Sequence, residues 1–155
     1  VTMGGSISAP VNGEDSPAES KSPAFMVVAS ADAQSAPLQR LQIIKGWYDD
    51  DGNHHQRVHD VAGDAGNGAS VNLDNCEPQG SGYEQLCAVW ADPDFDKAQS
   101  AVYYMRAVEN PTCRYSARQC LSIAQADRPQ DCRNDSVPQT IQERAWTSPI
   151  WYTAG

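Results

Sequence analysis

The sequence predicts a mainly β fold: an antiparallel, immunoglobulin-like β-sandwich with one short helix near its C-terminal third. Two observations favour this fold class. Short runs of apolar or alternating residues recur along the chain, and stretches rich in glycine and proline separate them. A third observation is that a single late segment combines a capping residue with apolar positions typical of a helix.

Six segments are expected to form strands, because each is short, apolar or alternating, and bounded by turn residues. In chain order they are residues 25–29, 38–47, 56–62, 83–90, 101–108 and 145–153. Asp-Gly and Gly-Asn steps within Asp49–Asn53 tolerate positive φ, so this segment is expected to join the second and third strands into a hairpin. Pro149 is expected at an edge or a bulge of the last strand.

The helix is expected over residues 117–125, with Ser116 as its N-cap and Leu121 and Ile123 as its apolar positions. Residues 1–23 are rich in Ser, Gly and Pro and have no hydrophobic period, which predicts a flexible lead-in or linker. A single disulfide-containing β-domain is expected over residues 24–155, because the chain of 155 residues has the length of one domain.

The formal net charge is −9, which argues against a nucleic acid as partner, because phosphate binding requires a surface rich in Lys and Arg. An anionic membrane surface is disfavoured for the same reason. No apolar run approaches the ~20 residues that span a bilayer, so no membrane span is expected. The ordinary consequence of such acidity is solubility.

The five cysteines are Cys76, Cys87, Cys113, Cys120 and Cys132, and they include no Cys-x-x-Cys pair. Disulfides in an oxidising compartment are therefore a better interpretation than a zinc or redox site, and they predict a periplasmic or secreted protein. Cys76 and Cys87 flank a Pro/Gly-rich loop and are expected to pair. Cys120 with Cys132 is the preferred second pair, while Cys113 with Cys120 is possible if the helix starts after Cys113. Because the count is odd, at least one thiol is free or pairs elsewhere.

Asp92, Asp94 and Asp96 have the alternating spacing of a calcium-binding loop. The sixth position of that loop is Lys97 instead of Gly, and the twelfth is Tyr103 instead of Glu. These three aspartates are therefore weak calcium candidates, and no metal site is expected in this chain.

The other candidate constellations also lack a required partner. The acidic turn Asp49–Asn53 has no carboxylate at the position where an EF-hand needs one. His55 and His59 are four residues apart, which on a strand places them ~13 Å from each other, too far for one metal ion. The sequence contains no Gly-x-Ser-x-Gly elbow and no phosphate-binding loop. We therefore expect no catalytic residue and no cofactor in this chain.

Five segments carry longer patterns of residues: 38–47, 58–62, 89–96, 109–115 and 142–152. The motif positions within them are Lys45, Gly46, Trp47, Trp90, Asp92, Asp94, Arg144, Trp146, Pro149 and Trp151. In order and spacing these segments resemble the C-terminal part of a large family of exported bacterial proteins of unknown function, which are several times longer. The N-terminal part of those proteins resembles metal-dependent hydrolases of the polymerase-and-histidinol-phosphatase (PHP) type.

The resemblance covers most of the chain and implies a non-catalytic accessory domain at the C-terminal end of an exported bacterial protein. It places a divalent metal and its ligands in an N-terminal module that this chain lacks, and it makes that module the expected partner. The ending Thr147–Trp151 also resembles the last strand of the β-sandwich that follows other PHP-type modules. An alternative is a carbohydrate- or ligand-binding module that uses the four tryptophans as a stacking face.

Overall fold

The computed structural model describes residues 1–8, 22–133 and 136–155, and the structural statements below refer to these residues. The strands are β1 (Ser6–Ser8), β2 (Ala24–Ser30), β3 (Leu38–Tyr48), β4 (His54–Gly63), β5 (Ser70–Val71), β6 (Pro78–Gln79), β7 (Gln85–Ala91), β8 (Ala101–Glu109), β9 (Thr112–Cys113), β10 (Thr140–Ile141), β11 (Arg144–Trp146) and β12 (Ile150–Thr153). The helical segments are α1 (Tyr115–Ser122) and two short 3₁₀ turns, Gln125–Asp127 and Gln130–Arg133. The mainly β class with a short helix in the C-terminal third is confirmed, while the immunoglobulin-like connectivity stays a prediction.

The larger sheet has the strand order β1-β12-β8-β3-β4, and β11 also pairs with β8. β3 lies in the middle, antiparallel to β4 on one side and to β8 on the other. Its side chains are buried on both faces of the sheet: Leu41 and Ile44 are 0% exposed and Ile43 is 2% exposed. The near-continuous apolar character of this segment is thus typical of a central strand.

The smaller sheet consists of β2 and β7, which pair antiparallel along their whole length and pack on one face of the larger sheet. The alternation of β2 turns Phe25 and Val27 inward, where they join Leu86 of β7 in the core. The larger sheet contributes Leu41, Ile43, Tyr103 and Tyr152 to the same core cluster. The hydrophobic contact between these two layers is the main apolar stabilisation of the fold.

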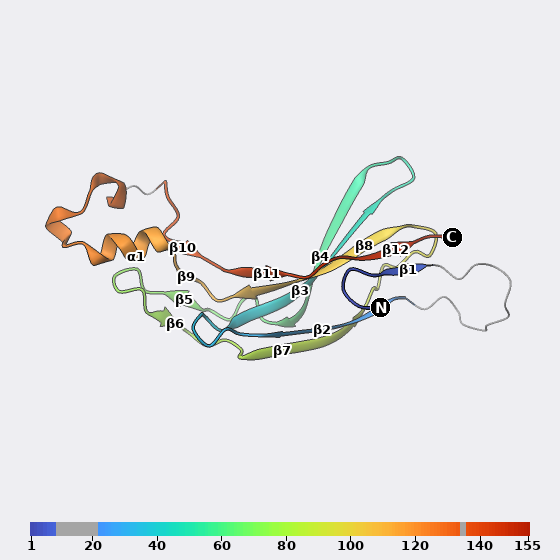
Figure 1. Ribbon diagram of the computed structural model, residues 1–155, viewed down its shortest axis with the longest axis horizontal. Coiled ribbons are helices and arrows are strands. Elements are labelled where there is room, and N and C mark those ends of the chain that lie inside the picture. Colours follow the sequence, from blue (N-terminus) through green and yellow to red (C-terminus); the bar gives the residue numbers. More distant parts are fainter. Residues whose placement is uncertain (9–21, 134–135) are drawn as a thin grey trace.

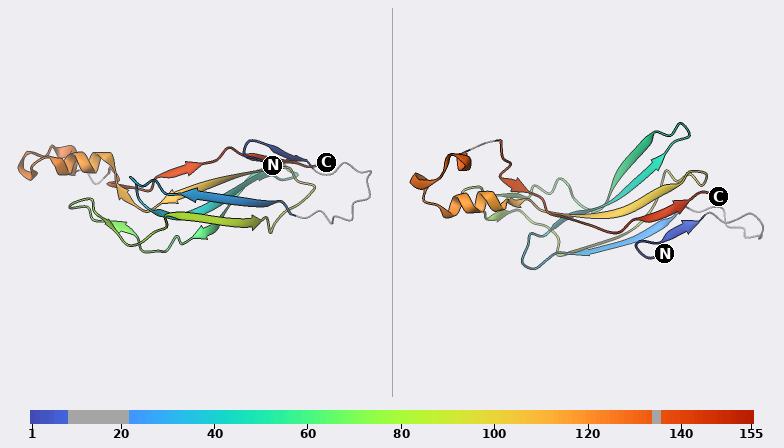
Figure 2. Two further views of the ribbon diagram at one scale, coloured as in Figure 1. Left: turned by 60° about the horizontal axis from the view of Figure 1, so that its bottom comes forward. Right: turned by 45° about the horizontal axis from the view of Figure 1, so that its top comes forward.

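The molecule is elongated, with α1 at the end opposite to the two termini (Figure 1). The β3–β4 hairpin projects away from the two layers at its turn, and the β2–β7 pair lies as a separate layer beside β8 and β12 (Figure 2). β5, β6, β9 and β10 are two-residue strands near the α1 end. No helix in the described ranges is long and apolar enough to cross a membrane.

The structure differs from the sequence-based expectations at both ends of the chain. Ser6–Ser8 forms β1, parallel to β12, where a flexible lead-in over residues 1–23 was expected; residues 9–21 of that lead-in lie outside the described residues. The expected last strand is divided into β11 and β12, and Pro149 lies in the break between them. This break lets β11 and β12 pair with two different stretches of β8.

The helix also begins earlier than expected. It starts at Tyr115, its N-cap position is Arg114, and no side chain caps it there, so Ser116 lies inside the first turn instead of capping it. The helix ends at Ser122, which leaves Ile123 at the C-cap. The backbone of the preceding residues explains the early start, because the Arg114 N–H donates to Gln139 and the chain leaves β9 directly into the helix.

Gly63 ends β4 with a φ of +82°, and a Cβ at this position would lie 2.3 Å from the Gln39 carbonyl oxygen. Gly63→Ala is therefore expected to lower the free energy of unfolding by about 2–4 kcal/mol, from the left-handed backbone and the displaced β3 backbone together. Gly52→Ala is the matched control: Gly52 has a φ of +80° but nothing within 4 Å of its Cβ position, so its loss is about 1–2 kcal/mol. Urea denaturation measures both; equal losses would contradict the close approach.

Candidate functional site

A buried ion pair connects the two sheets. The Nζ atom of Lys45 lies 2.6 Å from Oδ2 of Asp92, and the two side chains are 4% and 0% exposed. The Tyr103 hydroxyl donates to the same Oδ2 atom at 2.7 Å. The backbone N–H of Asp94 donates to the other carboxylate oxygen at 3.0 Å. Both oxygens of the buried Asp92 carboxylate therefore have protein donors.

The fold brings these three residues together from three strands or their ends. Lys45 follows Leu41 and Ile43 at every second position of β3, so its side chain points to the core face. Tyr103 is its direct cross-strand partner on β8. Asp92 comes immediately after β7, where its own N–H donates to the carbonyl of Pro23. The cluster thus anchors one end of the smaller sheet to the middle of the larger one.

Besides Asp92, the Lys45 ammonium contacts a backbone carbonyl and an aromatic ring. Its Nζ atom donates to the Asp94 carbonyl at 2.8 Å and lies 5.2 Å from the centre of the Trp47 ring. The cation is therefore neutralised by a carboxylate, solvated by a carbonyl and in contact with an aromatic face. These contacts lower the cost of burying a charge that has lost its water.

Burial and hydrogen bonding act in opposite directions on Asp92. Burial by itself raises the pKa of its carboxyl, but the hydrogen bonds from Lys45, Tyr103 and the Asp94 N–H outweigh it and hold the pKa below its ordinary value. Burial raises the pKa of the Tyr103 hydroxyl, and the adjacent carboxylate raises it further. The Asp92 carboxyl is therefore ionised and the Tyr103 phenol is neutral at neutral pH, and neither is poised to exchange a proton.

The weak calcium candidates are held by donors of the chain itself. Asp92 binds Lys45 and Tyr103, the Asp94 carboxylate pairs with Arg57, and Oδ1 of Asp96 accepts the Ala98 N–H. A hard cation needs several free oxygens that converge on one point, and this turn does not offer them. Within the described ranges, no group of three His, Cys, Asp or Glu residues is arranged to hold a metal ion.

A series of aromatic rings extends from the ion-pair cluster, and it begins with the Tyr103 ring, which lies 4.8 Å from the Phe25 ring. Trp90 stacks on Phe25 with ring centres 6.2 Å apart and lies 4.8 Å from the His59 ring. Gly46, next to Lys45, faces Val102, and a Cβ there would approach its side chain to 3.2 Å. Six of the ten motif positions therefore belong to this cluster or border it: Lys45, Gly46, Trp47, Trp90, Asp92 and Asp94.

His55 and His59 of β4 have separate surroundings. The His55 ring stacks on Trp47 with centres 5.4 Å apart and contacts the Asp49 carboxylate at 2.7 Å. Together with bonds from Asn53, this contact lowers the pKa of Asp49 to about 2. His59 instead packs against Trp90, and its Nε2 atom is buried without a hydrogen-bond partner among the described residues. The structure therefore gives these histidines different neighbours.

The remaining motif residues lie on or next to β11 and β12 of the larger sheet. Trp146 and Trp151 are 57% and 52% exposed, and they face Arg106 and Val102 of β8. Arg144 is exposed at the start of β11. The carbonyl of Pro149 accepts a hydrogen bond from Gly4. These four positions form no common site with the buried ion pair.

A second polar cluster was not recognised from the sequence. The side-chain amides of Gln39, Asn67, Asn110 and Gln142 are joined through hydrogen bonds of 2.9–3.3 Å. Gln39 and Asn110 are each 5% exposed. Asn110 also donates to the Ser81 carbonyl, so the cluster attaches the long β4–β7 connection to β3 and β8. Amides in loops form so many local contacts that their spacing alone does not reveal such a network.

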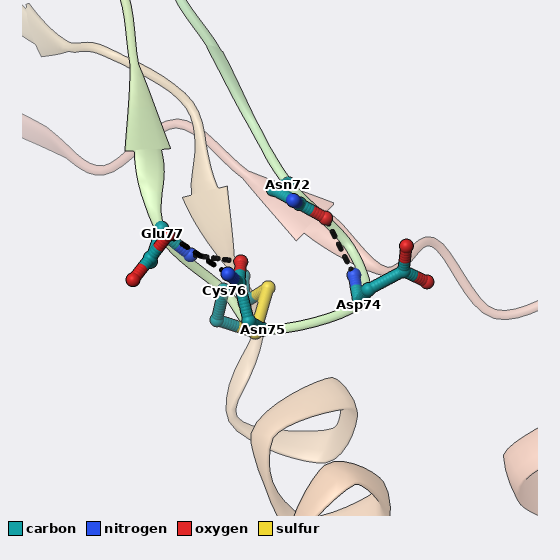
Figure 3. Close-up of a disulfide and its surroundings, with 6 residues drawn as sticks. Asn72, Asp74, Asn75, Cys76 and Glu77 are labelled. Carbon is teal, nitrogen blue, oxygen red and sulfur yellow. Dashed lines mark hydrogen bonds between the residues drawn. A yellow bond between two sulfur atoms is a disulfide. The ribbon is translucent and has the colours of Figure 1, made fainter.

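Two disulfides occur among the described residues, and one of them corrects the sequence-based expectation. Cys76 pairs with Cys113, with Cα atoms 5.6 Å apart, and not with Cys87 (Figure 3). The loop that carries Cys76 is held by bonds from Asp74 to the Asn72 side chain and from Cys76 to the Asn72 carbonyl, which turn its thiol toward β9. The expected Cys76–Cys87 pairing is therefore wrong.

The other disulfide joins Cys120 of α1 to Cys132, the pair that the spacing favoured. Cys87 has a free and exposed thiol on β7, which explains the odd cysteine count. Cross-links across 37 and 12 residues each stabilise a fold by about 3–4 kcal/mol in the chain-entropy account. Both lie near the α1 end, where two-residue strands provide little core.

The sequence matches the family described as Protein of unknown function (DUF3604) over residues 1–154. The chain belongs to the DUF3604 family. No curated protein and no solved structure matches this DUF3604 chain. The family match includes β1 and β12 as well as the strands that carry the ion pair, so it covers both layers of the fold.

Lys45→Met is expected to lower the free energy of unfolding by about 3–5 kcal/mol, because it leaves the Asp92 carboxylate buried without its cation. Tyr103→Phe removes one hydrogen bond and is expected to cost about 1–2 kcal/mol. Arg57→Met is the control, since the Arg57–Asp94 pair lies at the surface and contributes under ~1 kcal/mol. Urea denaturation measures all three, and a loss for Lys45→Met no larger than that for Arg57→Met would contradict the role of the buried pair.

The lowered carboxyl pKa values predict a loss of stability in acid. A carboxyl with a depressed pKa in the folded state contributes stability above its unfolded pKa and loses it as the pH falls through the folded pKa. For Asp49 this window runs from pH 3.8 down to about 2, and Asp92 changes stability in the same direction. Thermal melts from pH 7 to pH 2 are expected to be flat first and then to fall in this window. Asp49→Asn reduces the fall, while the neighbouring Asp50→Asn leaves it unchanged; equal effects would contradict the assignment.

Proposed function

We propose that this DUF3604 chain is a non-catalytic accessory domain of a longer exported protein, packed against a module that resembles a PHP-type metal-dependent hydrolase. In this role the domain stabilises that module or shapes the mouth of its active site. The divalent metal belongs to the hydrolase module, and this chain supplies no ligand to it. The five sequence segments that resemble the exported family support the presence of a hydrolase module. The outer face of the smaller sheet supports packing against it.

The outer face of the smaller sheet is the observation that supports packing against another module. Met26 and Val89 are direct cross-strand partners on this face and are 76% and 74% exposed. Val28, beside them, is 43% exposed and lies opposite the free thiol of Cys87. Strands that are apolar on both faces are typical of sheets covered on both sides. The inner face of β2–β7 has its cover in the larger sheet, and we assign the cover of the outer face to the hydrolase module.

The chemistry of the buried cluster supports a structural instead of a catalytic role. The Asp92 carboxylate is enclosed by Lys45, Tyr103 and the Asp94 N–H, so no substrate atom has access to its oxygens. A general acid or base must reach the proton that it transfers. Export of the parent protein is supported by the two disulfides, because an oxidising compartment preserves such bonds.

A carbohydrate-binding module is the alternative that one specific observation favours. The cross-strand partners of Trp146 and Trp151 on β8 are four residues apart, so both indole rings project from the same face of the sheet. Both rings are more than half exposed. Two exposed rings about 13 Å apart offer a stacking surface for a sugar chain.

The accessory role is tested by placing charges on the outer face of the smaller sheet. Met26→Lys with Val89→Lys is expected to change the stability of the 155-residue chain by less than about 0.5 kcal/mol, because both side chains are exposed there. In the full-length protein the same change is expected to cost about 3 kcal/mol, since two buried apolar contacts are lost. Thermal unfolding of both proteins measures the difference.

Leu73→Lys is the matched control, because Leu73 is 44% exposed on the β5–β6 connection, away from this face. The same small effect of Met26→Lys with Val89→Lys in both proteins would contradict the packing surface. Phosphoesterase or esterase turnover by the 155-residue chain with Mn²⁺ or Zn²⁺ would contradict the non-catalytic role. Binding on a glycan array that Trp146→Ala abolishes would favour the alternative.

A further inference from the structure

An apolar groove opens between the two layers along β2. A cavity of about 310 Å³ is lined by Phe25 and Val27 of β2 and by core-facing residues of the larger sheet, including Ile43, Tyr103 and Ile150. A neighbouring cavity of about 550 Å³ continues past Ala29 and Ser30 toward β11. The two cavities share Met3, Met105, Thr147 and Ser148, so they form one groove that follows β2 from Phe25 to Ser30.

All three methionines of the chain, Met3, Met26 and Met105, line this groove. Methionine side chains are flexible and polarisable, and they are common at surfaces that adapt to a bound segment. The floor of the groove is formed by core-facing residues of β3, β8 and β12 in the larger sheet. The groove therefore lies where a third strand of the smaller sheet would be placed.

One wall of the groove is a strand edge with unused backbone groups. β2 pairs with β7 on one side, and within the described residues no strand pairs with its other side. The bonds from Ala31 to the Glu84 carbonyl and from Asp92 to the Pro23 carbonyl show that the odd-numbered residues of β2 bond to β7. In an antiparallel pair the alternate residues direct their N–H and C=O groups away from the partner. Ala24, Met26, Val28 and Ser30 therefore present these groups to the groove side.

The edge of β2 also lacks the features that protect an edge strand from pairing. Its seven residues contain no charge and no proline. β4 is also an edge strand, because among the described strands it pairs only with β3. It contains Arg57, Asp60 and three histidines. Natural proteins place charges, prolines or bulges on edges that must stay unpaired. The edge of β4 is therefore protected in this way, whereas the edge of β2 is not.

We infer that β2 accepts an extended peptide segment of a partner protein, which adds as an antiparallel strand and places alternate apolar side chains in the groove. The backbone hydrogen bonds come from the free edge of β2, and the specificity comes from the apolar floor and the methionines. A small apolar molecule would use the floor and leave the backbone groups of the edge unpaired. This inference concerns the free edge of β2 and the groove beside it, and it does not depend on the accessory role.

The test uses a nine-residue peptide that alternates valine and threonine, and a 155-residue chain labelled with ¹³C at its methionine methyl groups. Binding is expected to shift the signals of the methionines that line the groove. In an antiparallel addition the residues that bond to β2 have outward side chains, which are the threonines. N-methylation of two central threonines is expected to weaken binding at least tenfold, because each lost hydrogen bond costs about 1 kcal/mol. N-methylation of the two neighbouring valines is expected to change the affinity less than threefold.

A protein variant provides a second measurement. Val28→Pro removes an N–H that faces the groove without removing a β2–β7 bond, and it is expected to weaken binding about fivefold. The matched control is Gln56→Pro on β4. The Asp49 N–H donates to the Asn53 carbonyl, so the odd-numbered residues of β4 near this turn bond to β3 and Gln56 directs its N–H away from β3. Equal affinity of the two N-methylated peptides, or no peptide binding, would overturn the inference. Dimerisation of the chain that the peptide reverses would overturn it too, because a second copy would then occupy the groove.

Discussion

The burial of one charge pair determines how the two layers are joined. Lys45 and Asp92 come from different sheets, and each is stable in the core only while the other is present. Tyr103 completes the pair from a third strand, so the relative position of β3, β7 and β8 is restricted by geometry that apolar contacts alone do not impose. The apolar core around Leu41 and Ile43 supplies the stabilisation, and the charge pair specifies which arrangement of the sheets uses it.

The local pattern of residues predicts the long strands well. β3, β4 and β8 begin and end within about two residues of the expected positions, because their alternation and turn residues are intact. β1 was not expected, since Ser6–Ser8 has no apolar period and becomes a strand through the bonds of Gly4 and Gly5 with the chain around Pro149 and Trp151. A strand that forms only through pairing with a distant segment is not predicted by the pattern of its own residues.

The candidate site was predictable only in part. A lysine at a core position of β3 requires a buried counter-ion, but the choice among 20 acidic residues depends on where the end of β7 lies. The pairing of Cys76 was mistaken for the same kind of reason. Cys87 lies on the outer face of β7, whereas the loop of Cys76 turns toward Cys113. The spacing of cysteines in the sequence does not predict the direction in which each side chain points.

The pairing of β1 with β12 has a consequence for how the chain is made. These strands come from opposite ends of the sequence, and the edge of β8 is completed only by β11 and β12. Residues 144–153 follow the other strands of the larger sheet in the chain, so during synthesis the edge of β8 stays open until these residues have emerged. Closure of the larger sheet is consequently a late event, governed by contacts between distant residues, and a folding helper would have to act before it.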